Sequence, residues 1–224
     1  MIMKKLLFLL TFALSASSTV FAEEVQINGL WYSLSEITAE VIKYKNDVKY
    51  SGSIVIPSSV SYNDIEYSVT SIGKEAFYDC ADLTSVTMPN SVTSIGSYAF
   101  DWCSNLTSVT IPNSVTNVGQ DAFSGCDGLT KVELNSNAIA SKSYINSSLG
   151  GIFGVQVEEY IIGENVTSIG NSAFSGCTGL TSVTIPNSVT NIGNEAFSNC
   201  KSLTSITIPN SVTTIGMMAF WGCI

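Results

Sequence analysis

Apolar and polar positions follow a repeating pattern along most of the chain. Counted from Leu83 as position 1, apolar side chains occupy positions 1, 4, 6, 10, 13, 17, 18 and 21, and small polar residues fill most of the others. The same 23-residue frame fits residues 106–128, 157–179, 180–202 and, incompletely, 203–224. An earlier unit joins the frame at Val69, and all six copies keep glycine at position 14, Ala-Phe at 17–18 and cysteine at 21. This regularity indicates one structural unit used repeatedly.

The pattern predicts the path of each coil. A period in the twenties with apolar residues at positions 1, 4 and 6 is typical of a right-handed leucine-rich-repeat solenoid, mainly β, with coils of about 23 residues. Positions 4 and 6 alternate as one face of a short strand must, so the coils should form a parallel sheet on the concave face. Proline at position 7 ends the strand because it has no N–H to donate. Glycine at position 14 permits a bend that a side chain would obstruct and would allow a positive φ. The Ala-Phe-x-x-Cys segment predicts a short helical or 3₁₀ turn on the convex wall.

Stacking of coils must bury the core, because one coil cannot close its own. The phenylalanines at position 18 should form one continuous internal stack: Phe77, Phe100, Phe123, Phe174, Phe197 and Phe220. Residues 23–50 lack the repeat but alternate apolar and polar positions, which predicts an N-terminal β-hairpin cap. Residues 51–224 are then the repeat domain, with 61–69 as a loop inserted into the first coil. The last repeat stops at Ile224 before it is complete, and we expect no such cover there.

Residues 129–156 depart from the frame, because they span 28 positions and lack the proline, the Ile-Gly pair and the cysteine. Phe153 is the candidate substitute for the stacked phenylalanine. Two interpretations are open. The segment is either a tolerated surface insertion, which we favour, or a binding feature from which Tyr144 and the Gly150-Gly151 loop project.

The N-terminus has the pattern of a secretory signal peptide. Two lysines precede the apolar stretch 6–14, which is too short to span a bilayer, and Val20 and Ala22 supply the small residues of a cleavage site. We therefore predict a signal peptide at residues 1–22 and a secreted or cell-surface location. No later apolar run has transmembrane length, so no membrane insertion is expected after cleavage.

Composition narrows the function classes. The chain carries 18 acidic and 9 basic residues, no arginine and no histidine. Such an acidic chain would repel phosphate backbones, which argues against nucleic acid as a partner. Without histidine there is no histidine-based catalytic triad and no histidine metal ligand. We predict no enzyme activity, no cofactor and no metal site, and we interpret the scattered turn acids as solvated rather than calcium-binding, because no Asp-x-Asp-x-Asp loop is present. These acids are Asp79, Asp82, Asp101 and Asp127.

The six cysteines allow two interpretations. An even number in an exported protein favours a disulfide framework. All six share position 21, however, and parallel side chains about 4.8 Å apart would have to bend toward each other to reach disulfide geometry. We therefore favour a column of free, buried thiols. A line of thiols also lacks the tetrahedral arrangement that zinc prefers.

The outward strand positions 3 and 5 are the candidate binding surface. They carry mainly serine and threonine with a charged patch midway: Ser85, Thr87, Ser108, Thr110, Lys131, Glu133, Glu159, Ile161, Ser182 and Thr184. Tyr98 and Trp102, on turns, are candidate aromatic anchors, since aromatic residues contribute strongly to interface energy. The alternative is that threonine merely suits exposed strand positions.

The phrase LTSVTIPNSVTxIGxxAFxxC, which recurs through residues 51–224, resembles the BspA-type leucine-rich repeat of bacterial surface proteins. The lead-in YSGSIVIPSSVSYNDIEYSVTSIG is also similar. The resemblance implies an exported surface or secreted protein, and some members adhere to host matrix proteins or to other bacteria. We predict a non-enzymatic adhesion or protein-binding module whose concave face contacts an extracellular protein or glycan.

Three alternatives remain open. The chain could be a structural spacer or gene fragment that associates end to end through its uncovered C-terminal end. The threonine ladder could order water, as ice-binding surfaces do, although the curvature and the Lys131/Glu159 interruption count against it. A carbohydrate-active enzyme would need two carboxylates at a suitable separation, which the spacing does not supply.

Overall fold

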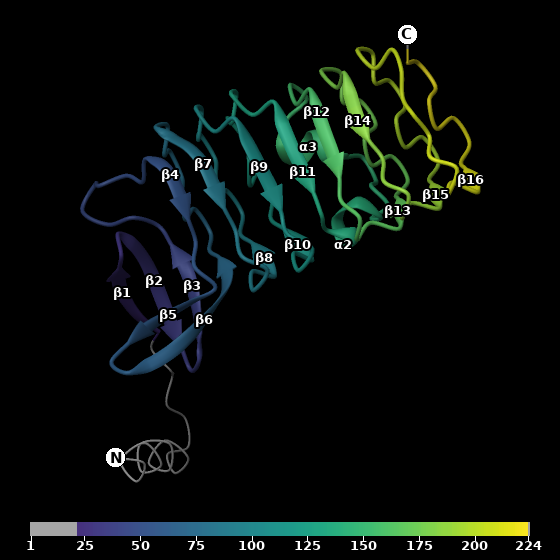
Figure 1. Ribbon diagram of the computed structural model, residues 1–224. Helices are drawn as coiled ribbons and strands as arrows, with labels where there is room; N and C mark the ends of the chain where they lie inside the picture. Colours follow the sequence, from purple (N-terminus) through teal and green to yellow (C-terminus); the bar gives the residue numbers. More distant parts are fainter. Residues whose placement is uncertain (1–21, 224) are drawn as a thin grey trace.

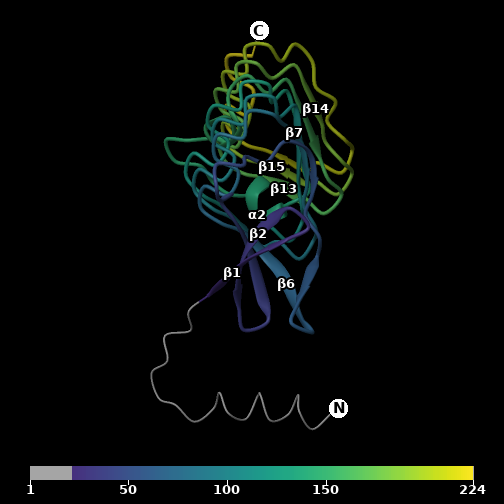
Figure 2. The same cartoon turned by 90° about the vertical axis from the view of Figure 1, so that its left-hand side faces the viewer.

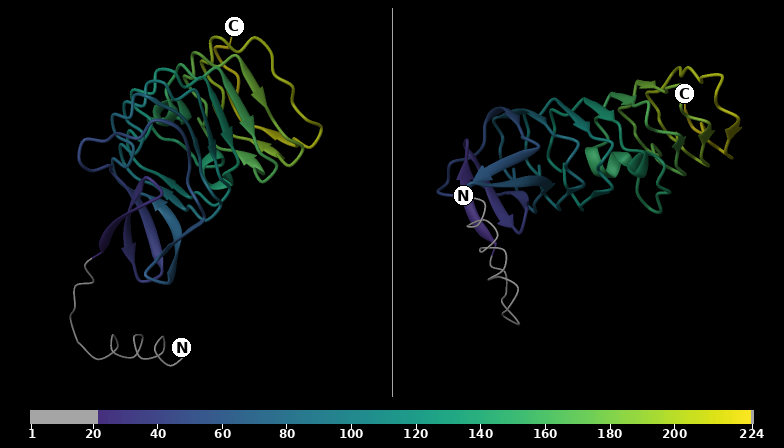
Figure 3. Two further views of the ribbon diagram at one scale, coloured as in Figure 1. Left: turned by 60° about the vertical axis from the view of Figure 1, so that its left-hand side comes forward. Right: turned by 60° about the horizontal axis from the view of Figure 1, so that its bottom comes forward.

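The protein is an elongated stack of coils with a β cap at its N-terminal end (Figure 1). The computed structural model describes residues 22–223, so the predicted signal peptide lies outside the described residues except for Ala22. Viewed nearly along the stack, successive coils lie one behind another (Figure 2). Two further views show the same single file of coils from cap to C-terminal end (Figure 3).

The first wall of every coil except the last is a strand in a six-stranded sheet, ordered β14-β12-β11-β9-β7-β4. Its strands are β4 (Gly52–Val55), β7 (Leu83–Thr87), β9 (Ser108–Ile111), β11 (Lys131–Leu134), β12 (Glu159–Ile162) and β14 (Ser182–Thr184). Every pairing is parallel and joins matching repeat positions, as Ser85 with Ser108 and Glu159 with Ser182. The predicted parallel sheet is confirmed, with one strand from every coil except the last, in which residues 203–209 form no strand.

A second wall of two-residue strands forms at positions 12 and 13. These strands are β8 (Ser94–Ile95), β10 (Asn117–Val118), β13 (Ser168–Ile169), β15 (Asn191–Ile192) and β16 (Thr214–Ile215). β8 pairs with β10, and β13, β15 and β16 form a separate sheet. Between β10 and β13 the irregular repeat places a short helix, α2 (Asn137–Ala140), in place of a strand. The 28-residue repeat therefore interrupts this wall while leaving the first wall continuous.

The third wall corrects the predicted helical turns. In the regular repeats the segment after position 14 is a run of turns, and a helix replaces it only in the irregular repeat, where α3 (Leu149–Phe153) lies. Positions 16 and 20 have positive φ in every regular coil, for example Tyr98 (φ 58) and Trp102 (φ 63). Alternate N–H groups then point at the next coil, as when Phe77 N donates to Ala99 O at 2.7 Å. A helix would turn these donors along its own axis, so coil-to-coil hydrogen bonding favours the turns.

Glycine at position 14 serves close approach between coils rather than the positive φ that the sequence allowed. Gly96 is absent from the positive-φ residues, and its N–H donates to Ile72 O at 2.8 Å. A Cβ on Gly96 would lie 2.6 Å from the backbone carbonyl carbon of Gly73 in the preceding coil. The backbones of neighbouring coils therefore approach each other closely at position 14, where there is no room for a side chain.

The N-terminal cap is larger than a hairpin. β1 (Glu23–Ile27), β2 (Leu30–Ser35) and β3 (Thr38–Ile42) form an antiparallel meander. β3 then pairs in parallel with β6 (Ile65–Ile72), which continues into the second wall through β8. Segment 61–69, predicted to be a loop, instead forms a hairpin of β5 (Ser59–Tyr62) with β6. Asn63 and Asp64 form its two-residue turn with positive φ, as a type I′ turn requires.

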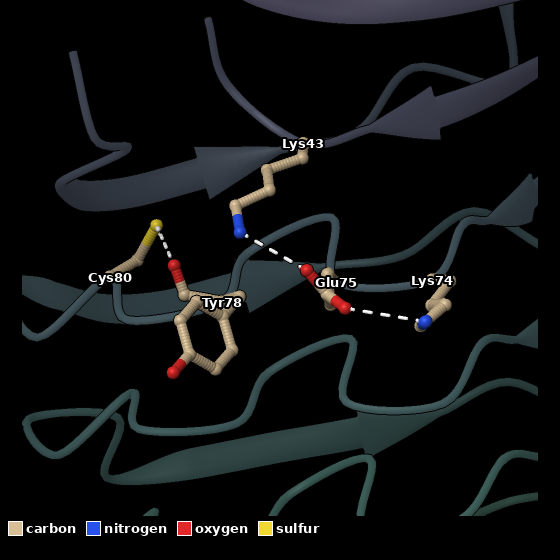
Figure 4. A network of polar contacts seen from close by, with 5 residues as sticks. All are labelled: Lys43, Lys74, Glu75, Tyr78 and Cys80. Carbon is tan, nitrogen blue, oxygen red and sulfur yellow. Dashed lines mark hydrogen bonds and ion pairs between the residues drawn. The ribbon is translucent and has the colours of Figure 1, made fainter. Parts of the chain in front are cut away.

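Polar contacts fasten the cap to the first coil (Figure 4). Lys43 Nζ lies 3.1 Å from Glu75 Oε2, and Lys74 Nζ lies 3.5 Å from the other carboxylate oxygen. The Lys43 ammonium also sits 4.5 Å from the ring centroid of Tyr78, within the range of a cation–π interaction. The cap is therefore joined to the first coil by the Lys43–Glu75 ion pair as well as by the pairing of β3 with β6.

Aromatic rings form the predicted internal ladder. Phe77, Phe100 and Phe123 stack at centroid distances of 4.9 Å with interplanar angles of 4° and 11°. Phe153 takes the place expected of it, 5.0 Å from Phe123, and Tyr160 links it to the later rings. Phe174, Phe197 and Phe220 complete the ladder at 4.9 and 5.3 Å.

The cysteines form a column of free thiols beside the ladder. The thiols of Cys103 and Cys126 each donate at 3.1 Å to the carbonyl of the phenylalanine one coil earlier, and Cys200 does so at 3.0 Å. Burial raises the pKa of Cys80 and of Cys177 to about 11. These thiols therefore stay protonated near neutral pH, where a thiol is a poor nucleophile.

Tyr160→Phe is expected to increase the free energy of unfolding by about 1 kcal/mol. The Tyr160 hydroxyl is buried and has no hydrogen-bond partner among residues 22–223, so it loses hydration without compensation. Tyr144→Phe is the matched control, because the Tyr144 hydroxyl donates to Ile139 O at 2.9 Å and its removal should cost stability. Urea denaturation followed by circular dichroism measures both, and a destabilised Tyr160→Phe variant would contradict this account.

Candidate binding face

Two columns of outward side chains cross the first wall, and we call them together the strand face. The position-3 column consists of Ser53, Ser85, Ser108, Lys131, Glu159 and Ser182, and the position-5 column of Val55, Thr87, Thr110, Glu133, Ile161 and Thr184. Residues between them along each strand, such as Val109 and Val132, are buried. Successive side chains on a strand point to opposite faces, so the ten predicted strand residues share one surface.

The charged centre of the strand face is paired internally. Lys131 Nζ lies 2.9 Å from Glu159 Oε2, and both side chains are roughly half exposed, at 45% and 38%. Glu133 accepts hydrogen bonds from Thr110 at 3.3 Å and from Asn135 at 3.0 Å. An exposed ion pair contributes only about 0–1 kcal/mol. These groups can therefore exchange their present partners for those of a ligand at small cost.

The structure adds two residues that the sequence reasoning missed. Ser53 and Val55 on β4 extend the columns toward the cap, and the Ser85 hydroxyl donates to Ser53 Oγ at 2.7 Å. Val55 is 68% exposed, which makes it the most apolar accessible point at this end of the face. The available signal was the segment SIVIP at 53–57, which matches SVTIP at 108–112.

A polar hollow of about 430 Å³ lies where the strands end. It is lined by Asn90, Asn113, Ser114, Asn135 and Asn165. All five residues follow the strand at positions 7 to 9, where most repeats read Pro-Asn-Ser, so the repeat frame could have predicted them. Asn135 connects the hollow to the strand face through its bond to Glu133. Amide groups both donate and accept hydrogen bonds, which suits polar ligands.

The two predicted aromatic anchors do not belong to the strand face. Tyr98 and Trp102 lie at positions 16 and 20, on the turn wall. Trp102 is 56% exposed, and its ring lies over Gly125 of the next coil, where an added Cβ would be 3.1 Å from Trp102 Cδ2. A ligand on the strand face therefore meets neither aromatic side chain, and any role for them is on a separate surface.

The idea that Tyr144 projects from the irregular repeat is wrong. Its side chain is buried, with 8% exposed, and its hydroxyl is bound to Ile139 O. The chain instead exposes the neighbouring Ile145, which is 84% accessible. The insertion thus packs its tyrosine inward as part of the core.

Among residues 22–223 no group of three or more histidine, cysteine, aspartate or glutamate side chains is arranged to hold a metal ion. Neither helix in this part of the chain has the length and apolar character needed to cross a membrane. The main candidate site in the described residues is therefore the strand face, a broad and mostly polar surface on a six-stranded sheet.

A solenoid of coils that contribute successive strands to one parallel sheet is typical of leucine-rich-repeat proteins. Residues 53–154 and 153–224 match the family model of the BspA type leucine rich repeat region, in six copies. The chain belongs to this family. None of the curated proteins compared with it is similar.

Solved structures of bacterial proteins share the fold. A leucine rich cell surface protein from Faecalibacterium prausnitzii A2-165 is 34% identical, with a TM-score of 0.56 over 90% of this chain and 52% of that one. A leucine-rich repeat protein from Eubacterium ventriosum is 24% identical, with a TM-score of 0.65 over 92% and 51%. The T. pallidum leucine rich repeat protein is 24% identical, with a TM-score of 0.55 over 93% and 89%. The chain spans about half the length of the first two.

Proposed function

We propose that the chain is an exported, non-enzymatic module that binds an extracellular protein or glycan through the strand face, as adhesion proteins do. The observation that carries this proposal is the pair of in-register columns of accessible side chains on a six-stranded sheet. The similar F. prausnitzii protein is a cell surface protein, which supports an extracellular location.

The strand face is suited to binding because its geometry is fixed before a ligand arrives. The backbone under the face is hydrogen-bonded on both sides, and its inward residues are locked in the core. Serine and threonine lose little rotamer entropy on binding compared with long side chains. Six strands at about 4.8 Å spacing present a surface roughly 25 Å across. Many weak contacts across such a width can add up to useful affinity.

Ser108→Arg combined with Ser182→Arg should weaken binding at least about tenfold, a loss of about 1.4 kcal/mol. Both serines are exposed and flank the Lys131–Glu159 pair in one column, so large charged side chains there would obstruct a ligand without disturbing the core. The measurement is surface plasmon resonance against immobilised matrix proteins, cell-surface proteins and glycans, first to find a ligand and then to compare variants.

The matched control is Asn117→Arg combined with Thr214→Arg, which adds the same charge to exposed positions on the second wall. Both double variants should melt near the temperature of the unmodified protein. If the control weakens binding as much as the strand-face variant, the contact lies elsewhere or is purely electrostatic, and the proposal fails.

A further inference from the structure

The turn wall contains a break between the third and fourth coils. In the preceding coil Tyr98, Phe100 and Trp102 donate their N–H groups to the coil that follows, at 3.0, 2.7 and 2.8 Å. One coil later, the matching N–H groups of Asp121, Phe123 and Gly125 donate to no backbone carbonyl of residues 22–223. This row of alternate donors therefore lacks the partner that the regular coils provide.

The irregular repeat explains the break. It places α3 where the next run of turns would lie. The backbone carbonyls of a helix point along its axis, so those of α3 do not point at the donors of the preceding coil. The core stays closed because the Phe153 ring still stacks 5.0 Å from Phe123. On its other side the same repeat restores the pattern, since Leu149 N donates to Ala173 O at 2.7 Å. On the side of Phe123, by contrast, none of the three alternate donors has a backbone acceptor among residues 22–223.

A hollow of about 310 Å³ opens at the Asp121 end of this row. Val118, Ile145 and Ile152 give it apolar contact surface, and Gln120, Asp121 and Lys142 give it polar groups. Ile145 is 84% exposed, which is unusual for an aliphatic side chain set beside unpaired backbone donors. The hollow therefore combines apolar area with a hydrogen-bonding backbone edge.

We propose that this hollow binds a peptide segment that presents backbone carbonyls as the turn wall of a regular coil does and that carries an aliphatic or aromatic side chain. Its backbone carbonyl accepts the Asp121 N–H, and its side chain packs against Val118, Ile145 and Ile152. The chain itself indicates the occupant, because the partner of such donors in regular coils is always a run of alternate carbonyls from a neighbouring backbone. Addition of a peptide to an open backbone edge is an established recognition mode. The site lies apart from the strand face and does not depend on it.

The test uses a peptide that copies a natural partner of these donors. The synthetic probe TNIGNEAFSN has the sequence of residues 190–199, whose carbonyls at Asn194, Ala196 and Ser198 accept from the preceding coil. In ¹⁵N NMR titration of the full chain, the amide signals of Asp121 and residues 142–152 should shift. Amide exchange at Asp121 should also slow when the probe is bound. A scrambled peptide of the same composition should produce neither effect.

Ile145→Asp should weaken probe binding at least about tenfold, because it replaces the exposed apolar contact with a charge. The matched control is Val155→Asp, which alters a 52% exposed aliphatic residue of the same repeat that does not line the hollow. Both side chains are largely outside the core, so both variants should keep the melting temperature of the parent.

Absence of amide shifts at about 1 mM probe, or shifts confined to the C-terminal coil, would overturn the inference. Equal affinity of the Ile145→Asp and Val155→Asp variants would overturn it as well. The strand-face variant Ser108→Arg/Ser182→Arg should bind the probe normally, so failure of this site and failure of the strand face are distinguishable.

Discussion

Phe100→Ala is expected to lower the free energy of unfolding by about 3–5 kcal/mol, the usual loss for truncating a buried phenylalanine. The Phe100 ring is fully buried and lies between Phe77 and Phe123, 4.9 Å from each. Its removal takes away apolar burial and two ring–ring contacts at once. The neighbouring coils cannot collapse into the space, because hydrogen bonds on all three walls hold their separation.

The control for this variant is Phe220→Ala at the other end of the ladder. Phe220 is only partly buried and stacks on one ring, Phe197, so its loss should be less than half as large. Guanidinium denaturation followed by far-ultraviolet circular dichroism compares the two. In a stacked array, stability is shared between neighbours, so the central variant should also broaden the transition or separate it into two. Equal losses at both positions would show that the ladder is not a continuous core.

The repeat frame predicted the parts of this fold that depend on burial. Leucine at position 1 and phenylalanine at position 18 recur because each must meet its copy in the next coil, and Leu83 and Phe100 are fully buried accordingly. The same frame predicted the strand face, since alternation along a strand determines which side chains point outward. Phe153 could be assigned to the ladder despite the irregular repeat, because one aromatic residue was available where one was needed.

The turn wall could not be predicted in the same way. Its left-handed positions are occupied by glutamate, tyrosine and methionine as well as glycine, as at Glu75, Tyr98 and Met218. These residue types carry no local preference for positive φ. The conformation is selected by hydrogen bonds between coils, which involve backbone groups common to every residue. Position 20 did carry a signal, because it is glycine, asparagine or aspartate in every regular coil except that of Trp102. Position 16 carries no such pattern, and a helical turn was the closest local interpretation.

The contacts at the candidate sites also required coordinates. The sequence places Lys131 and Glu159 in one column, but their ion pair depends on a 28-residue repeat returning to strand register. The unpaired donors beside Ile145 arise because α3 replaces the turns whose carbonyls would accept from the preceding coil. No pattern in the sequence predicts this replacement. Tyr98 and Trp102 were expected on turns and do lie there, but the sequence does not show whether a turn side chain can reach a ligand on the strand face.

Gly96→Ala should lower the free energy of unfolding by about 3 kcal/mol, the upper part of the range for over-packing. A Cβ at this position would lie 2.6 Å from both the carbonyl carbon of Gly73 and the amide nitrogen of Lys74. Both are backbone atoms, so no side-chain rotation can relieve the contact. The coils would have to separate locally, which stretches the 2.8 Å hydrogen bond from Gly96 N to Ile72 O. A single methyl group should therefore act as a wedge between two coils.

Gly151→Ala is the matched control, because it adds the same methyl group to a glycine within α3. There the nearest atom to the new Cβ is Ser147 Oγ at 2.8 Å, a side-chain oxygen that can rotate away. Alanine also has the higher helix propensity, so this variant should be neutral or slightly stabilised in the same denaturation experiment. Amide hydrogen exchange adds a local readout, since the wedge should speed exchange at Gly96 and at Thr93, whose N–H donates to Thr70 O at 2.9 Å. Equal stability of the two variants, with unchanged exchange at Thr93, would show that the coils can move apart freely and that the glycine column does not set their spacing.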